Sequence, residues 1–119
     1  MAPREMAIDE QCPPTFKVSD EPQRLRFKDL LVDLDAYRVS RAGRMIELGP
    51  TEYRLLCFFL RHPSKVFTRE NLIESVWPAD ASIDVRTVDV HIGRLRRSLR
   101  RHGQADLIRT VRSVGYALG

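Results

Sequence analysis

The sequence predicts a single α+β domain with short antiparallel strands first, three helices next and a β-hairpin at the end. Three observations lead to this fold class. Apolar and polar residues alternate in short runs between residues 24 and 48, apolar residues recur at helical spacing in three segments between 51 and 101, and a strand–turn–strand pattern follows. A chain of 119 residues has room for one such domain rather than two.

The first 22 residues are predicted to be a flexible tail or linker, so that the domain occupies residues 23–119. Prolines interrupt this stretch, which is otherwise largely polar and shows no sustained periodicity. Such a segment buries too little apolar surface to offset the entropy that is lost on ordering.

The segment from Arg24 to Leu48 is predicted to form three or four antiparallel strands. The runs RLRF, LVDLD, YRVSR and RMIEL alternate in polarity, and residues 28–29, 35–36 and 42–43 have the composition of tight turns. A sheet of this size needs a helix to cover its apolar face.

Two helices are predicted next, over residues 51–62 and 69–77, and a proline follows each of them. Proline at position 50 fits the first helical turn, where its missing N–H is not needed. The first helix is apolar around most of its circumference, so we expect it at the centre of the core. Thr68 is a suitable N-cap for the second helix.

A third helix, over residues 86–101, is basic on one side. Asp84 or Ser82 can cap its start, and Gly103 is a candidate for its C-cap. The helix also carries six arginines, against a single acid, Asp89. One narrow apolar stripe is predicted to be buried: Val88, Ile92, Leu95 and Leu99.

This arginine face favours an anionic partner. Residues 51–119 carry 12 Lys/Arg and 7 Asp/Glu, whereas residues 1–50 carry 8 and 9. A solvated charged face is the ordinary alternative, but such faces usually mix glutamate with lysine, and this one has almost a single sign. Arginine can pair bidentately with a phosphate or with the O6/N7 edge of guanine.

The last segment, DLIRTVRSVGYALG, is predicted to be a β-hairpin with its turn at residues 113–115 and with Arg109 and Arg112 near its tip. Two helices of which the second is basic, followed directly by a hairpin, make a winged helix-turn-helix. In this arrangement the second helix fits the major groove of DNA, and an arginine on the hairpin can reach the narrower minor groove.

Three segments of the chain are similar to a known family in their order and spacing: LGPTEYRLLCFFLRHPSKVFTRENLIESVW, RTVDVHIGRLRRSL and IRTVRSVGYAL. The chain resembles the DNA-binding effector domain of OmpR/PhoB-type response regulators over roughly residues 24–118. The residues of the first two segments are most similar to the branch of this family that controls phosphate-responsive genes. The resemblance implies a four-stranded N-terminal sheet, three helices and a C-terminal hairpin wing.

The resemblance also implies a function and partners. The function would be sequence-specific binding of double-stranded DNA in a two-component system that regulates transcription. Two protomers would bind in tandem to a direct-repeat operator, and a phosphorylated receiver domain would precede this fragment. The loop over residues 78–83 would contact the sigma subunit of RNA polymerase.

Carried over position by position, the resemblance implies a set of DNA contacts. Arg94 would read a base edge, Val90 would touch a thymine methyl group, and Arg112 would enter the minor groove. The N-terminus of the helix over 51–62 is expected to bind phosphate. The remaining positions match contacts to the DNA backbone, groove-facing sites or general electrostatic attraction: Trp77, Arg86, Thr87, His91, Arg96, Arg97, Thr110 and Tyr116.

Several of these positions have a structural alternative, because a core or flanking role would also explain them: Trp77, Thr87, His91, Thr110 and Tyr116. The sequence also departs from the family pattern twice. Gly93 stands where relatives often have lysine or arginine, which removes one phosphate contact and lowers helix propensity by about 1 kcal/mol. Val85 stands where an acid commonly precedes the arginine, and Asp84 is a possible substitute.

The composition argues against an enzyme. The three histidines and Cys57 lack the spacing of a zinc site, and the chain contains no GxSxG, HExxH or glycine-rich phosphate loop, so we expect no catalytic residue, metal or cofactor. No apolar run approaches the ~20 residues of a membrane span. The start of the chain lacks the apolar stretch of a signal peptide, so a bacterial cytoplasmic location is the default expectation.

Two other uses of the basic helix stay open at this point. The first is an RNA-binding module, although such modules usually expose aromatic residues for stacking on bases, whereas Phe58 and Phe59 have core-like positions. The second is a winged helix that binds an acidic protein. The salt dependence of duplex binding separates both from a DNA-binding domain.

Overall fold

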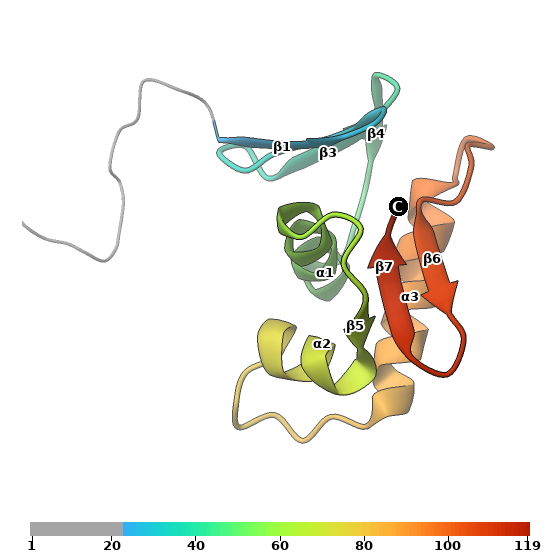
Figure 1. Ribbon diagram of the computed structural model, residues 1–119. Coiled ribbons are helices and arrows are strands. Elements are labelled where there is room, and N and C mark those ends of the chain that lie inside the picture. The colour runs from blue at the N-terminus through green and yellow to red at the C-terminus, as the bar shows by residue number, and fades with distance from the viewer. Residues whose placement is uncertain (1–22) are drawn as a thin grey trace, which may run out of the picture.

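The computed structural model describes residues 23–119 and confirms the α+β winged helix-turn-helix. The predicted tail, residues 1–22, lies outside the described residues. In Figure 1 a four-stranded sheet lies above helix α1, α1 lies above α2, and α3 stands beside the C-terminal hairpin. The order of strands, helices and hairpin along the chain is the predicted one.

The N-terminal sheet is antiparallel in the order β1-β2-β3-β4, as predicted. Two of its turns use left-handed backbone at the expected positions, with φ of 53° at Lys28 and of 52° and 81° at Ala42 and Gly43. In the second of these turns both central residues, Ala42 and Gly43, have positive φ, which matches the twist of a two-residue hairpin. The strands are β1 (Arg24–Phe27), β2 (Leu30–Asp33), β3 (Arg38–Arg41) and β4 (Arg44–Ile46).

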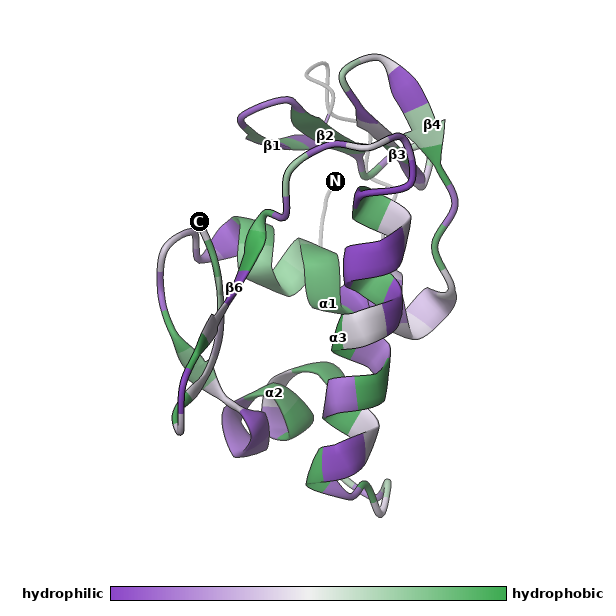
Figure 2. Cartoon of the chain, turned by 90° about the vertical axis from the view of Figure 1, so that its right-hand side faces the viewer, coloured by the Kyte–Doolittle hydropathy of each residue, from purple (hydrophilic) through white to green (hydrophobic). Residues whose placement is uncertain are grey.

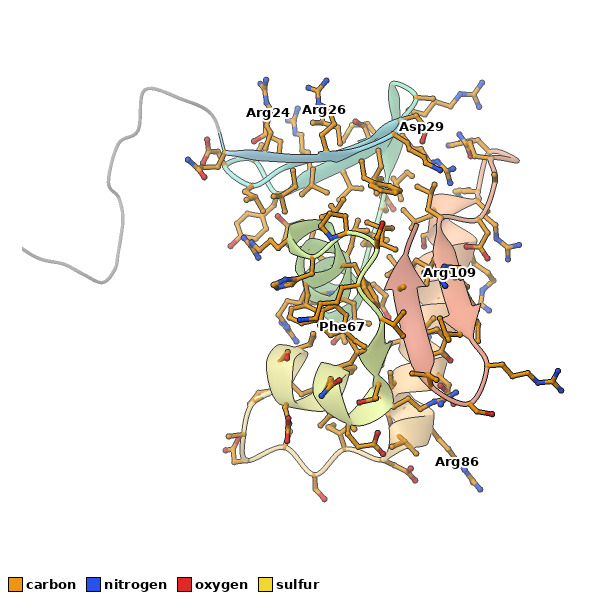
Figure 3. The ribbon with its side chains drawn as sticks, viewed as in Figure 1. Arg24, Arg26, Asp29, Phe67, Arg86 and Arg109 are labelled. Atoms are coloured by element: carbon orange, nitrogen blue, oxygen red, sulfur yellow. The ribbon has the colours of Figure 1, made fainter. Side chains whose placement is uncertain are left out.

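The two faces of this sheet differ in polarity. On the outer face, Arg24 and Arg26 point away from the helices (Figure 3). The inner face packs on α1 (Pro50–Arg61), so the sheet and the helix close one core between them. The strand register aligns an apolar row on this inner face: Leu25, Val32, Val39 and Ile46.

The first two helices end one residue before their predicted boundaries, α1 at Arg61 and α2 (Arg69–Val76) before Trp77. Trp77 leaves the helix with ψ of 153° because the residue before a proline is pushed into extended backbone. Thr68 caps α2 as predicted. Its hydroxyl accepts from the backbone N–H of Asn71, and the Asn71 side chain accepts from the backbone N–H of Thr68.

Helix α3 (Val85–Leu99) buries all four residues of the predicted apolar stripe. Hydrophobic and hydrophilic residues therefore alternate along it, as Figure 2 shows. Asp84, rather than Ser82, is the N-cap and accepts from the backbone N–H of Arg86 at 3.1 Å. The predicted end at residue 101 is wrong, because the backbone turns after Leu99, and Gly103 adopts its φ of 84° within the following turn.

The C-terminal hairpin was predicted from the sequence, but the third strand of the small sheet to which it belongs was not. Strands β6 (Ile108–Val111) and β7 (Gly115–Leu118) form the wing, and β5 (Phe67–Thr68) adds a third strand in the order β5-β7-β6. A strand of two residues has no periodicity to detect. Gly115 is required where β5 and β7 meet, since a Cβ there would lie 1.9 Å from the carbonyl oxygen of Phe67.

One arginine is buried between the N-terminal sheet and α3. Arg41 is 2% exposed, and its Nε donates to Asp29 Oδ1 at 3.0 Å. Its Nη1 donates to the carbonyl oxygen of Leu99 at 2.8 Å. Leu99 is the last residue of α3, where carbonyl groups lack helical partners and a positive charge is favourable. Arg41 thus fixes the C-terminal end of α3 to the sheet.

We predict that Arg41→Met lowers the free energy of unfolding by about 1–3 kcal/mol, because the carbonyl of Leu99 and the carboxylate of Asp29 both lose their donor. Urea denaturation measures the change. Arg38→Met, at an exposed position of the same strand, is the matched control and is expected to change stability by less than about 0.5 kcal/mol. Equal losses in the two variants would contradict a specific role for Arg41.

Candidate nucleic-acid interface

The outer side of α3 presents exposed side chains that have no partner among residues 23–119. Arg86, Arg94 and Arg97 are exposed, and within residues 23–119 their guanidinium groups make no hydrogen bond or ion pair. Arg86 extends into solvent from the N-terminal end of the helix (Figure 3). Val90 lies among them and is 51% exposed. This side of α3 therefore offers positive charge and one apolar contact to a partner.

An open cleft of about 550 Å³ lies where the start of α1 meets the outer side of α3. Its lining brings together arginines that the sequence spaces one helical turn apart or more. Residues from α1 and α3 line it: Gly49, Glu52, Arg94, Arg97, Ser98 and Arg101. The cleft is suited to an anionic group, except at the one acid in its wall.

That acid, Glu52, is buried in the first turn of α1 and binds His91 of α3. His91 Nδ1 donates to Glu52 Oε2 at 2.5 Å. Burial tends to raise the pKa of the Glu52 carboxyl, but the bonds from His91 and from its own backbone N–H, with the charges of His91 and Arg94, hold the pKa below its ordinary 4.5. The start of α1 thus carries a carboxylate that His91 binds, and the phosphate contact expected at this helix N-terminus stays a prediction.

The hairpin presents Arg112 in the turn after β6, and the residue is exposed as predicted. The predicted place of Arg109 at the tip is wrong. Arg109 is paired with Ala117 in the register, and its Nε donates to the carbonyl oxygen of Gly119, so it lies toward the open end of the hairpin. Thr110 and Val111 of β6 separate Arg109 from the turn, which occupies residues 112–114, one residue earlier than predicted.

Arg96 joins α3 to the wing. Its Nη2 donates to the carbonyl oxygen of Ile108 at 3.0 Å and to the hydroxyl of Thr110, both on β6, and its Nε lies 3.5 Å from Asp106. Thr110 itself is exposed. The guanidinium of Arg96 is thus engaged inside the protein, which distinguishes it from the arginines on the outer side of the helix.

Tyr116 is held in a second polar group between the wing, α2 and α3. Its ring is buried, and its hydroxyl donates to Asp89 Oδ1 at 2.6 Å. Arg69 Nε donates to the same oxygen at 2.6 Å. The guanidinium groups of Arg69 and Arg96 lie 5.3 and 5.4 Å from the centre of the Tyr116 ring. The single acid of α3 is therefore neutralised within the protein and does not oppose an anionic partner.

Two further predicted positions, Trp77 and Thr87, are half-buried. The ring of Trp77 lies 5.8 Å from that of His91, centre to centre. Trp77 therefore packs at the edge of the arginine surface, the exposed side of α3 that carries Arg86, Arg94 and Arg97. Of the predicted contact residues, the structure thus gathers the exposed set on α3 and the wing, whereas Arg96 and Tyr116 bind other protein groups. Asp89 stands out in the sequence as the single acid of the helix, but no sequence pattern indicates its partner Arg69, which lies 20 residues earlier.

Gly93 lies on the solvent side of α3 and has room for a side chain. A Cβ there would find only Arg97 Nη1 within 4 Å, at 3.9 Å. No packing constraint explains the glycine, so it lowers helix propensity without a gain inside the protein. Its effect is to leave the backbone of α3 uncovered between Val90 and Arg94.

A family model described as transcriptional regulatory protein, C terminal, matches residues 43–118. The chain belongs to this family. The phosphate regulon transcriptional regulatory protein PhoB of Rhizobium meliloti (strain 1021) is 49% identical over 94 residues, which are 79% of this chain and 41% of the relative. The chain spans about two fifths of the length of that curated relative.

Solved structures place this family member among OmpR/PhoB-type effector domains. The DNA-binding domain of response regulator AdeR, in complex with an intercistronic region, is 35% identical with a TM-score of 0.70, over 78% of this chain and 96% of that one. DrrB of Thermotoga maritima, described as an OmpR/PhoB homolog, is 31% identical with a TM-score of 0.70. The match covers 80% of this chain and 43% of the DrrB chain. The chain therefore has the family and the fold of the C-terminal domains of transcriptional regulatory proteins.

In the part of the chain that the structure describes, no helix is long and apolar enough to cross a membrane.

We predict that Asp89→Asn destabilises this domain in a pH-dependent way. Burial tends to raise the pKa of Asp89, but the bonds from Tyr116 and Arg69 hold it below its ordinary 3.8. The stabilisation by this carboxylate is therefore fully present above 3.8 and is lost as the pH falls through the lower folded-state value.

Urea denaturation of wild type and variant at neutral pH and in strong acid measures this. The two unfolding free energies should differ at neutral pH and converge in acid. Asp80→Asn, on the exposed loop after α2, is the control and should match wild type at both pH values. A difference for Asp89→Asn that does not change with pH would contradict the assigned ion pair.

Proposed function

We propose that this chain is the sequence-reading effector domain of a two-component response regulator that controls phosphate-responsive genes. The observation that carries the proposal is a set of exposed arginines on α3 and on the adjoining wing whose guanidinium groups bind nothing else within residues 23–119: Arg86, Arg94, Arg97 and Arg112. The relative named for the phosphate regulon supports the choice of target genes.

The exposed residues take roles that follow from their place. Arg94, in the middle of the outer side of α3, reads a base edge in the major groove, and Val90 beside it contacts a thymine methyl group. Arg112 at the turn of the wing enters the minor groove. The phosphate contacts, which give affinity without sequence information, come from Trp77, Arg86, Thr87, His91, Arg97 and Thr110.

Arg96 and Tyr116 take a different role from the one that the resemblance implies. Arg96 binds Ile108 and Thr110, and Tyr116 binds Asp89, so we assign both to holding the wing beside α3. The hairpin lies next to α3 in both Figure 1 and Figure 2. A wing held in this way keeps a constant distance between the groups that enter the two grooves.

Two protomers bound in tandem would read a direct repeat, each covering about one helical turn of DNA. A phosphorylated receiver domain would precede this domain in the whole protein, which the shorter span of this chain relative to PhoB supports. A regulator of bacterial transcription acts where the DNA is, so we place the protein in the cytoplasm.

We predict that Arg94→Ala removes the preference for a specific sequence and keeps much of the non-specific binding. The lost base contact corresponds to about 1–3 kcal/mol of discrimination. Fluorescence anisotropy with a phosphate-box-like direct repeat, a single half-site and a scrambled duplex, over a salt series, measures this. Wild type should bind the repeat most tightly, with two protomers per duplex and a steep salt slope.

Arg26→Ala is the matched control, because Arg26 points away from the helices on the outer face of the sheet (Figure 3). Equal losses of Arg94→Ala on specific and scrambled DNA would contradict base reading. Equal, salt-steep binding of wild type to repeat and scrambled duplex would keep DNA binding but remove the phosphate-gene assignment. No binding of wild type to any duplex would favour a winged helix that binds an acidic protein or RNA.

The loop over residues 78–83 is proposed to contact the sigma subunit of RNA polymerase. It joins α2 to α3, and Pro78, Asp80 and Ser82 are exposed along it. We predict that Asp80→Ala lowers transcription by purified RNA polymerase at a promoter saturated with the protein and leaves duplex binding unchanged. Unchanged transcript levels would contradict this partner, and weaker duplex binding would show that the loop contacts DNA instead.

A further inference from the structure

The buried pair of Glu52 and His91 connects the core helix α1 to the arginine surface of α3, and the proposed roles above leave Glu52 unused. We propose that Glu52 is a positioning residue for DNA binding, which holds His91 by Nδ1 so that the opposite nitrogen, Nε2, donates to a DNA phosphate. The inference rests on the proposed function, since it deepens the phosphate contact assigned to His91.

The carboxylate of Glu52 is fixed in place. It is 7% exposed and lies in the first turn of a 12-residue helix. Its Oε2 accepts from His91 Nδ1 at 2.5 Å. An ionised carboxylate can only accept a hydrogen bond, so the hydrogen of this contact belongs to His91.

The imidazole of His91 is therefore oriented with one nitrogen inward and one outward. Its Nδ1 faces Glu52, and the Trp77 ring packs 5.8 Å away, centre to centre. Within residues 23–119, Nε2 of His91 has no hydrogen-bond partner. The buried side-chain polar atoms there that lack a partner are Tyr53 Oη and Arg96 Nε alone. His91 Nε2 is therefore not a buried atom and is accessible to solvent. The side chain keeps 19% exposure on the same helix as Arg94.

The chemistry of this arrangement depends on one proton. A neutral ring with its hydrogen on Nδ1 has a lone pair at Nε2, which repels a phosphate oxygen. A ring with hydrogen on both nitrogens donates to Glu52 on one side and to the phosphate on the other. Glu52 and the phosphate oxygen both accept hydrogen bonds, so the ring with hydrogen on both nitrogens is the form that binds both at once.

The other charged groups around the pair are arginines, which disfavour a positive charge on His91, whereas Glu52 favours it. Arg94 of α3 is close enough to influence the Glu52 carboxyl, and Arg97 and Arg101 line the same cleft. From the end of α2 the pair meets Trp77, which carries no charge. Three arginines disfavour a further positive charge on α3, and Glu52 is the acid in the cleft that offsets them.

The proposal makes the sign of one substitution diagnostic. Simple repulsion between an acid and DNA predicts that Glu52→Gln tightens duplex binding, because a negative charge beside the phosphates is removed. A positioning role predicts the opposite. We expect Glu52→Gln to weaken binding of the direct-repeat duplex about tenfold in mildly acidic buffer, the loss of one charge-assisted hydrogen bond.

The experiment measures duplex affinity by anisotropy from mildly acidic to mildly basic pH at constant ionic strength. Wild-type affinity should fall as the pH rises, and Glu52→Gln and His91→Ala should both lack this dependence. Glu70→Gln is the matched control, since it removes the same charge from the exposed first turn of α2. It should keep the wild-type pH dependence and bind as tightly as wild type or slightly more tightly.

The double variant Glu52→Gln/His91→Ala separates positioning from a purely structural effect. If Glu52 acts through His91, the double variant binds DNA as weakly as His91→Ala alone. Additive losses would overturn the proposal, and so would tighter binding by Glu52→Gln or a wild-type affinity that does not change with pH. Urea denaturation verifies that each variant is folded under the binding conditions.

A measurement on the wild-type protein keeps the proposal testable even where Glu52→Gln fails to fold. Nitrogen-15 NMR of His91 in the duplex complex should show hydrogen on both ring nitrogens. A neutral ring in the complex would overturn the inference and leave DNA binding itself untouched. Failure of wild type to bind any duplex would instead remove the proposed function.

Discussion

The structure depends on the burial of one narrow apolar stripe of α3. The opposite side of the same helix stays exposed to solvent. Val88, Ile92, Leu95 and Leu99 are at most 1% exposed, and burial of each such side chain contributes roughly 1.5–3 kcal/mol. This stripe seats α3 on α1 and α2. Since the stripe takes up little of the circumference, the rest of α3 is available for polar contacts along its whole length.

Those contacts divide the arginines into two groups. Arg41, Arg69 and Arg96 bind carboxylates or carbonyl oxygens of the protein and fix the end of α3, its middle and the wing. Such pairs tie elements together but leave no donor for a ligand. The arginines on the outer side of α3 and at the tip of the wing have no such partners in the described part of the chain, so their charge is available there to a phosphate or a base edge.

The acids show the same division of tasks. Asp89 and Glu52 lie within or beside the arginine surface, yet each is bound by protein donors, Asp89 by Arg69 and Tyr116 and Glu52 by His91. A like charge near DNA would ordinarily weaken binding, and neutralisation inside the protein prevents this. The same two acids hold Arg69, Tyr116 and His91 in place by hydrogen bonds. The arginine surface of α3 therefore keeps its positive charge.

The sequence by itself determined the fold class and the basic side of α3, because both depend on local patterns. Alternation predicted three or four strands, the stripe and the arginines predicted α3, and the caps were expected at Thr68 and at Asp84 or Ser82. Tertiary structure alone decided which polar groups meet. The partners Arg41 and Leu99, or Glu52 and His91, lie 58 and 39 residues apart, and no periodicity encodes a contact between such distant positions. For that reason the structure, rather than the sequence, separates the arginines that hold the domain together from those that bind no other group among residues 23–119.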